Sequence, residues 1–155
     1  MDIISLASGA GLWDWSWREL GNNIKVQCEK DKTNLCILNQ AFPESIKYND
    51  ILDINLDNLN NIKFYDSTFV VSFCNKKFSL INPKRLNNDL LDEEYNDPIY
   101  DRLIFLTDKY KPRFVVVESV MGFTHHYQGL RRLVYEFKKI QYQSLSLCIP
   151  AMIFG

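Results

Sequence analysis

Short apolar runs alternate with segments of helical spacing along the first third of the chain. Each apolar run has the length of a strand, and each segment between the runs places apolar residues three or four positions apart. Gly21 is a C-terminal cap for the first helical segment, and Phe42-Pro43 ends the second. The pattern predicts strands at residues 3–7, 24–28 and 45–48, and helices at residues 12–20 and 31–40.

Two polar stretches interrupt this alternation in the rest of the chain. Residues 53–63 are rich in Asn and Asp and are predicted to be too polar for a core, so we expect a loop with one helical turn at most. Residues 74–94 are also polar and predict a long loop, and loops of that length usually have a function. Further strands are predicted at residues 69–73, 114–117 and 145–148, and further helices at residues 97–110 and 129–140.

Strands that alternate with helices predict a parallel sheet with helices on both faces, the doubly wound, Rossmann-like α/β class. The run Val115-Val116-Val117 is apolar throughout, as expected of a strand buried on both sides. We expect one domain over residues 1–155, without repeats or an internal linker. Ligands of such sheets bind beyond the carboxyl ends of the strands, where the predicted elements place Gly9, Glu29, Asp50, Cys74 and Glu118.

Charge and composition narrow the class of function. The chain has 18 basic and 19 acidic residues, so it lacks the basic excess of a protein that grips a phosphate backbone by net charge. Its four cysteines have no metal-ligand spacing, and neither do His125 and His126, so we expect no metal site. Without a signal peptide or an apolar run of membrane length, the chain is expected in the cytoplasm, or in the nucleus of a eukaryote.

Three features at the predicted carboxyl edge suit an adenosyl ligand. Gly9 and Gly11 follow the first strand, where a glycine turn lets the backbone approach a ligand closely. Glu29 ends the second strand roughly 20 residues later, the position of a carboxylate that binds a ribose diol. Asp50 ends the third strand and could accept a hydrogen bond from an exocyclic amine, although Asn-Asp pairs also occur in ordinary turns.

The order of these pieces resembles the cytosine-5 DNA methyltransferase family. The most specific piece is Lys111-Pro112, then an apolar strand, then Glu118-Ser119-Val120 with Phe123 a few positions on. The resemblance covers essentially the whole chain. The other matching segments are Ser5 to Leu12, Glu29-Lys30, Asn49-Asp50-Ile51, Phe73-Cys74-Asn75 with Phe78-Ser79, the helix from Asp97, Ile140-Gln141-Tyr142 and Met152 to Gly155.

This resemblance implies a fold, a cofactor and a mechanism. In the family, a cysteine thiolate attacks carbon 6 of a flipped-out cytosine while a glutamate hydrogen-bonds the ring nitrogen. Cys74 and Glu118 are the matching residues here. The cofactor is S-adenosyl-L-methionine (AdoMet), and the positions implied to bind it are Ala7, Ser8, Gly9, Gly11, Leu12, Glu29, Lys30, Asp50, Ile51, Ser72 and Ile99.

Several positions depart from the family pattern. Phe73 replaces the proline before the cysteine, Asn75 replaces the glutamine after it, and Ser119 replaces the asparagine after the glutamate. Ala7 also stands where a phenylalanine usually lies against the cofactor. Because an error near 1 Å in a catalytic loop can cost about 100-fold in rate, these departures concern catalysis more than the fold.

Family members continue beyond the equivalent of Gly155 into a Pro-Gln-x-Arg segment, a target-recognition domain and a final helix. We therefore expect the catalytic-side half of such an enzyme, which binds DNA only with a second chain and does not methylate a specific site alone. An uncovered apolar surface near residues 145–153 predicts association with that chain or with a second copy. A pseudoenzyme that acts through AdoMet or a partner, a methyltransferase for RNA and an unrelated nucleotide-binding protein remain alternatives.

Overall fold

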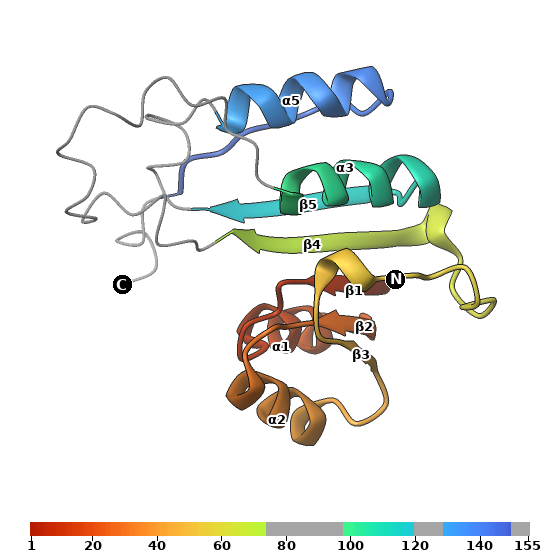
Figure 1. Ribbon diagram of the computed structural model, residues 1–155, viewed down its shortest axis with the longest axis vertical. Coiled ribbons are helices and arrows are strands. Elements are labelled where there is room, and N and C mark those ends of the chain that lie inside the picture. The colour runs from red at the N-terminus through yellow and green to blue at the C-terminus, as the bar shows by residue number, and fades with distance from the viewer. Residues whose placement is uncertain (74–97, 120–128, 150–155) are drawn as a thin grey trace, which may run out of the picture.

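The computed structural model describes residues 1–73, 98–119 and 129–149. Five parallel strands form one sheet in the order β3-β2-β1-β4-β5, and all five arrows in Figure 1 point the same way. This confirms the predicted α/β class. The strands are β1 (Asp2–Leu6), β2 (Asn23–Cys28), β3 (Ile46–Tyr48), β4 (Ser67–Phe73) and β5 (Phe114–Ser119), and the helices are α1 (Leu12–Glu19), α2 (Lys32–Ala41), α3 (Pro98–Tyr110) and α5 (Gly129–Lys139), with short 3-10 helices η1 (Ile51–Asp53) and η2 (Phe64–Asp66).

Alternating side chains of each central strand pack on opposite faces of the sheet. Ile3 of β1 faces α1 and α2, where it packs with Leu38 and Phe42. Ile4, one residue later, faces α3 and α5 and joins a larger cluster. Side chains in a strand point to alternate faces, so an unbroken apolar run is what two buried faces require. The larger cluster includes Leu6, Val26, Phe69, Val71, Leu103, Leu106, Leu133 and Phe137.

The polar stretch after η1 contributes to the core, contrary to the prediction for residues 53–63. Ile54, Leu56 and Ile62 are buried in the cluster beneath α3. These side chains are interspersed with Asn and Asp, so the segment turns its apolar side chains inward and leaves the polar ones in water. Average polarity over the segment concealed this arrangement.

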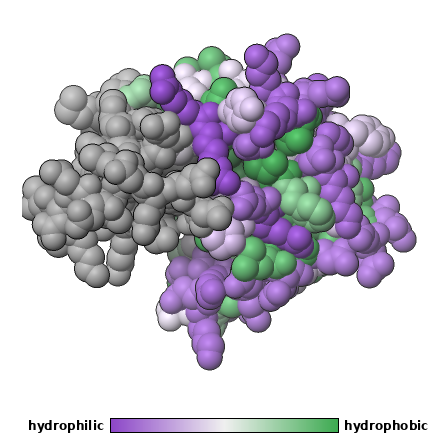
Figure 2. Space-filling view, turned by 45° about the horizontal axis from the view of Figure 1, so that its top comes forward, coloured by the Kyte–Doolittle hydropathy of each residue, from purple (hydrophilic) through white to green (hydrophobic). Residues whose placement is uncertain are grey.

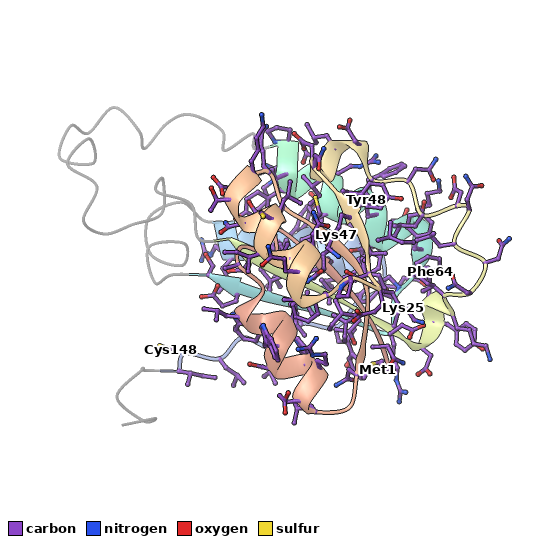
Figure 3. The ribbon with its side chains drawn as sticks, turned by 90° about the horizontal axis from the view of Figure 1, so that it is seen from below. Met1, Lys25, Lys47, Tyr48, Phe64 and Cys148 are labelled. Carbon is purple, nitrogen blue, oxygen red and sulfur yellow. The ribbon has the colours of Figure 1, made fainter. Side chains whose placement is uncertain are left out.

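The predicted strand at residues 145–148 is absent. Residues 142–149 form no helix or strand, and Leu145 and Leu147 are 84% and 72% exposed. Figure 3 shows Cys148 away from the body of the sheet and helices. Alternating apolar and polar residues favour a strand only where a neighbouring strand supplies hydrogen bonds, and β5 pairs with β4 alone in the described part of the chain. The predicted loop at residues 74–94 lies outside the described residues.

The surface has no extended apolar face in the view of Figure 2, where hydrophobic groups lie among hydrophilic ones. Within the described ranges, no helix combines the length and hydropathy needed to cross a membrane. Trp13 and Trp15 of α1 are 42% and 43% exposed, whereas Trp17 packs against the core. The three tryptophans thus do not all face inward.

Candidate functional site

A tight turn joins β1 to α1 at the carboxyl edge of the sheet. Ala7, Gly9 and Gly11 have left-handed φ angles of 64°, 57° and 83°. The turn is tied to β2 by a 2.8 Å hydrogen bond from the Ser8 amide to the Cys28 carbonyl. Left-handed residues at alternate positions turn successive backbone amides toward one side, which creates a concave site for an acceptor group.

Glu29, directly after β2, supplies the acceptor for this turn. Its Oε2 accepts a hydrogen bond from the Gly9 amide at 2.7 Å, and its Oε1 accepts one from the Asp31 amide at 2.8 Å. Asp31 in turn caps α2 by accepting a hydrogen bond from the Asn34 amide. A carboxylate has about four lone-pair positions, so Glu29 holds the turn and keeps acceptor capacity toward a bound ligand.

A cleft of about 350 Å³ opens beside the turn. Trp13, on the first turn of α1, forms part of its wall and is 42% exposed. A pocket of this size with few polar groups is typical of small-molecule sites. Six predicted cofactor positions line it, namely Ala7, Ser8, Gly9, Leu12, Glu29 and Ser72, together with Ala10 and Trp13, which the sequence analysis did not assign.

Asp50 lies beside Glu29 because β3 pairs with β2 in register, with Cys28 opposite Tyr48. Its carboxylate accepts a hydrogen bond from the Leu52 amide at 3.0 Å and forms a 3.0 Å ion pair with Lys30. The Leu52 amide, and secondly Lys30, hold the pKa of Asp50 below its ordinary value. Asp50 is therefore ionised at neutral pH and can accept a hydrogen bond from a ligand amine.

Lys30 and Asp50 are not among the described residues that line the cleft. The other three predicted cofactor positions lie in or against the core. Gly11 is buried below the turn, where a Cβ atom would stand 2.7 Å from Leu38 Cδ2. Ile51 is a buried member of the larger core cluster, and Ile99 packs against that cluster from α3. These three residues support the turn and the strand ends without lining the cleft.

Ser72 connects the cleft to the predicted catalytic acid. β4 and β5 pair with Ser72 opposite Glu118, and the Ser72 hydroxyl donates a 2.6 Å hydrogen bond to Glu118 Oε2. Because Ser72 also lines the cleft, Glu118 lies one side chain away from the glycine turn region. Cys74 follows the last described residue of β4 and lies outside the described residues.

A hydrogen-bonded network of polar side chains lies beneath α1. Asp14 is fully buried, and its Oδ2 accepts a 2.5 Å hydrogen bond from Gln27 Nε2. Gln27 Oε1 accepts a 2.7 Å hydrogen bond from Ser45, whose hydroxyl accepts one from the Lys47 ammonium at 2.7 Å. Figure 3 shows Lys47 at the α2 side of the sheet. This network links α1, the helix that follows the turn, to strands β2 and β3.

One carboxylate oxygen of Asp14 has no hydrogen-bond partner in this network. Its Oδ1 is buried without a hydrogen-bond partner in the described part of the protein. Burial raises the pKa of the Asp14 carboxyl, and neighbouring side chains, including Ser5 and Gln27, offset only part of that effect. Asp14 and Gln27 could not be paired from the sequence, because their proximity depends on how α1 packs on the sheet.

Cys28 is buried below the turn, and burial raises the pKa of its thiol to about 12, so it is a packing residue rather than a nucleophile. Among the residues that the structure describes, no three His, Cys, Asp or Glu side chains are grouped to hold a metal ion.

The five-stranded parallel sheet is of the Rossmann-like α/β class and matches part of the methyltransferase fold, and comparisons with known proteins specify the family. The model of the C-5 cytosine-specific DNA methylases matches residues 1–155. The chain therefore belongs to the C-5 cytosine-specific DNA methylase family, whose members use AdoMet and act on DNA. A search of curated proteins found no match.

Solved structures agree with the fold. A putative DNA modification methyltransferase encoded within an E. coli prophage is 19% identical with a TM-score of 0.67, over 90% of this chain and 38% of its own. The DNMT2 protein of Spodoptera frugiperda is 22% identical with a TM-score of 0.59, over 90% and 41%. The Dnmt2 methyltransferase of S. pombe is 14% identical with a TM-score of 0.58, over 87% and 40%. The chain thus spans about two fifths of each of these proteins.

Proposed function

We propose that this chain is the AdoMet-binding and base-activating part of a cytosine-5 DNA methyltransferase. The observation that carries the proposal is the position of Ser72, which lines the cleft beside the glycine turn and hydrogen-bonds Glu118. A cofactor in the cleft and a base held at Glu118 would then be neighbours. Methyl transfer requires this proximity, because the reacting carbon and the methyl donor must meet in one site.

The residues of the cleft, together with Asp50 after the neighbouring strand β3, fit AdoMet. Gly9 lacks a side chain, and a Cβ atom added to it would meet nothing within 4 Å, so backbone and ligand can approach there. The spare lone pairs of Glu29 suit the two ribose hydroxyls, and Asp50 suits the adenine amine. Trp13 offers an aromatic surface at the cleft wall. When bound, AdoMet would supply an electrophilic methyl group.

The chain's own residues would make cytosine reactive. In the proposed reaction, the thiolate of Cys74 adds to carbon 6 of the flipped base while Glu118 hydrogen-bonds the ring nitrogen. Carbon 5 then has the electron density to take up the methyl group. Water then takes the proton of carbon 5, the electron pair of that bond forms the carbon 5–carbon 6 double bond, and the carbon 6–sulfur bond breaks to release the Cys74 thiolate. Ser72 would hold Glu118 toward the base during these steps.

We further propose that residues outside this sequence read DNA, because the sequence spans only about two fifths of the solved methyltransferases. A catalytically inactive, methyltransferase-like protein is the second candidate. Phe73 and Asn75 on either side of Cys74 favour it, since the family has proline and glutamine at these positions. The two candidates differ in methyl transfer but agree in AdoMet binding.

Calorimetric titration with AdoMet tests the cofactor site. Asp50→Ala should weaken binding about 10- to 100-fold, because a hydrogen bond to a charged group contributes about 1.5–3 kcal/mol. Asp57→Ala is the matched control. Asp57 likewise forms an ion pair with a lysine, Lys109 at 2.7 Å, and is not a predicted cofactor position, so its removal should leave affinity unchanged. Equal weakening by both variants would contradict a direct ligand contact at Asp50.

Methyl transfer from labelled AdoMet to cytosine-containing DNA tests the chemistry, with and without a second chain that begins with a Pro-Gln-x-Arg segment. Glu118→Gln should lower the rate about 100- to 1,000-fold with AdoMet affinity unchanged, because it removes base activation alone. Cys74→Ser should abolish transfer. Wild-type protein that binds AdoMet without methylating DNA in either condition would support the inactive candidate, and Cys74→Ser with full activity would exclude Cys74 as the nucleophile.

A further inference from the structure

The turn between β1 and α1 has the shape of an anion site. Its left-handed residues Ala7, Gly9 and Gly11 direct backbone amides to one side, directly before the first turn of α1. Turns of this type in other nucleotide-binding folds hold phosphate groups. In this chain, however, the Gly9 amide already donates to a carboxylate oxygen of Glu29 at 2.7 Å.

Glu29 therefore acts as an internal anion. Both of its oxygens are held by backbone amides, from the turn at Gly9 and from the start of α2 at Asp31. A phosphate bound at the turn would have to displace this carboxylate or lie beside it. Two like charges about 4 Å apart near a protein surface repel by several kcal/mol before screening.

The surrounding charges add to the repulsion of a phosphate group. Asp50 stands on the neighbouring strand end, and its Oδ2 takes the ammonium group of Lys30 in a 3.0 Å ion pair. Lys30 is thus engaged by Asp50. Among residues 1–73, 98–119 and 129–149, none of the side chains that line the cleft is basic. The described part of the cleft therefore presents the carboxylate of Glu29, and no positive charge, to a group bound at the glycine turn.

We propose that Glu29 is a specificity-determining residue that makes the cleft accept adenosine compounds with a neutral or cationic 5′ group and reject 5′-phosphates. The cleft then selects a sulfonium compound over AMP, ATP or a dinucleotide by charge, in addition to shape. This inference deepens the proposed function, since it rests on an adenosyl ligand in the same cleft. It concerns discrimination at the 5′ position and not methyl transfer.

Titration of the full chain with adenosine and with AMP tests the inference, using tryptophan fluorescence or calorimetry. Wild-type protein should bind adenosine at least 10-fold more tightly than AMP. Glu29→Gln should reduce this ratio at least 10-fold, chiefly by tighter AMP binding, because the amide keeps an acceptor for Gly9 and loses the charge. Asp31→Asn is the matched control, since it removes one negative charge nearby but retains the cap of α2. It should change the ratio less than 3-fold.

Added salt should reduce the wild-type discrimination, because screening weakens repulsion. Circular dichroism melting establishes that each variant is folded. An unchanged ratio in Glu29→Gln, an equal change in Asp31→Asn, or no binding of either compound to any variant would overturn the inference. A parallel AdoMet titration separates the two proposals. Discrimination by Glu29 without AdoMet binding would sustain the inference and refute the proposed function, whereas AdoMet binding without discrimination would refute only the inference.

Discussion

Gln27→Leu is expected to lower the free energy of unfolding by about 3–5 kcal/mol at neutral pH. Gln27 Nε2 is the donor that Asp14 Oδ2 accepts from, and Asp14 is fully buried. Removing one partner of a buried charged group leaves the other without compensation, which is among the costliest changes in a core. Ser45 can donate its hydroxyl hydrogen to the Phe42 carbonyl instead, at 3.2 Å. The substitution therefore leaves Asp14, and not Ser45, with one hydrogen bond fewer. Urea unfolding measures it.

The pH dependence of this loss has a definite sign. Burial raises the pKa of Asp14 in the folded protein, so ionisation of Asp14 opposes folding. The contribution of Asp14 to the free energy of unfolding is therefore most favourable below the pKa of the unfolded state. This contribution is lost as the pH rises through the pKa of the folded state. Gln27 stabilises the ionised form. Gln27→Leu should therefore raise the folded pKa further, and its cost should be smaller at pH 4.5 than at pH 7.5. If Gln27→Leu lowered the free energy of unfolding equally at both pH values, ionised Asp14 would not be the source of the instability.

Two comparison variants isolate the buried pair. Gln40→Leu makes the same chemical change on the exposed side of α2 and should alter stability by at most about 0.5 kcal/mol. Asp14→Leu combined with Gln27→Leu should recover much of the loss, because replacing both partners leaves no unpaired charge. A double variant as unstable as the sum of its single changes would show that packing, and not the hydrogen bond, determines the cost.

Gly11→Ala is expected to destabilise the fold by about 2–4 kcal/mol. Gly11 has a φ of 83°, where a side chain is strained. Its Cβ would also lie 2.7 Å from Leu38 Cδ2 and 3.1 Å from the Phe42 ring. Both neighbours have no exposed surface and belong to a packed cluster, so they cannot move away without further cost. Thermal or urea unfolding measures the sum of strain and overpacking.

Gly21→Ala separates these two contributions. Gly21 has a nearly equal φ of 79°, but a Cβ atom there meets nothing within 4 Å, so only the strain of about 1–2 kcal/mol is expected. The excess cost at Gly11 should shrink when Leu38 is shortened to valine. If Gly11→Ala and Gly21→Ala were equally destabilising, close packing beneath the turn would have no energetic effect.

Much of the fold was predictable because its signals are local. The apolar runs and their spacing identified all five strands of the sheet and all four described α-helices. The failures came where context decides. Leu145 and Leu147 have a strand pattern without a described neighbour to pair with, and Ile54, Leu56 and Ile62 are buried although most residues around them are polar.

The candidate site was predictable to the extent that it follows strand ends. Parallel strands bring their carboxyl ends to one edge, so Gly9, Glu29, Asp50 and Glu118 could be grouped from their order along the chain. Which hydrogen bonds these residues form was not predictable. The sequence placed Glu29 near a ribose site, but only the folded chain brings its carboxylate to the Gly9 amide.

The sequence by itself determined the alternation of strands and helices, the carboxyl edge as the candidate site and the family resemblance, because each depends on spacing along one chain. The tertiary structure alone decided that Ser72 hydrogen-bonds Glu118, that Lys30 pairs with Asp50 and that Asp14 is buried against Gln27. These contacts join residues on different elements. Their formation depends on strand register and on how α1 packs against the sheet, and neither is encoded in any single segment.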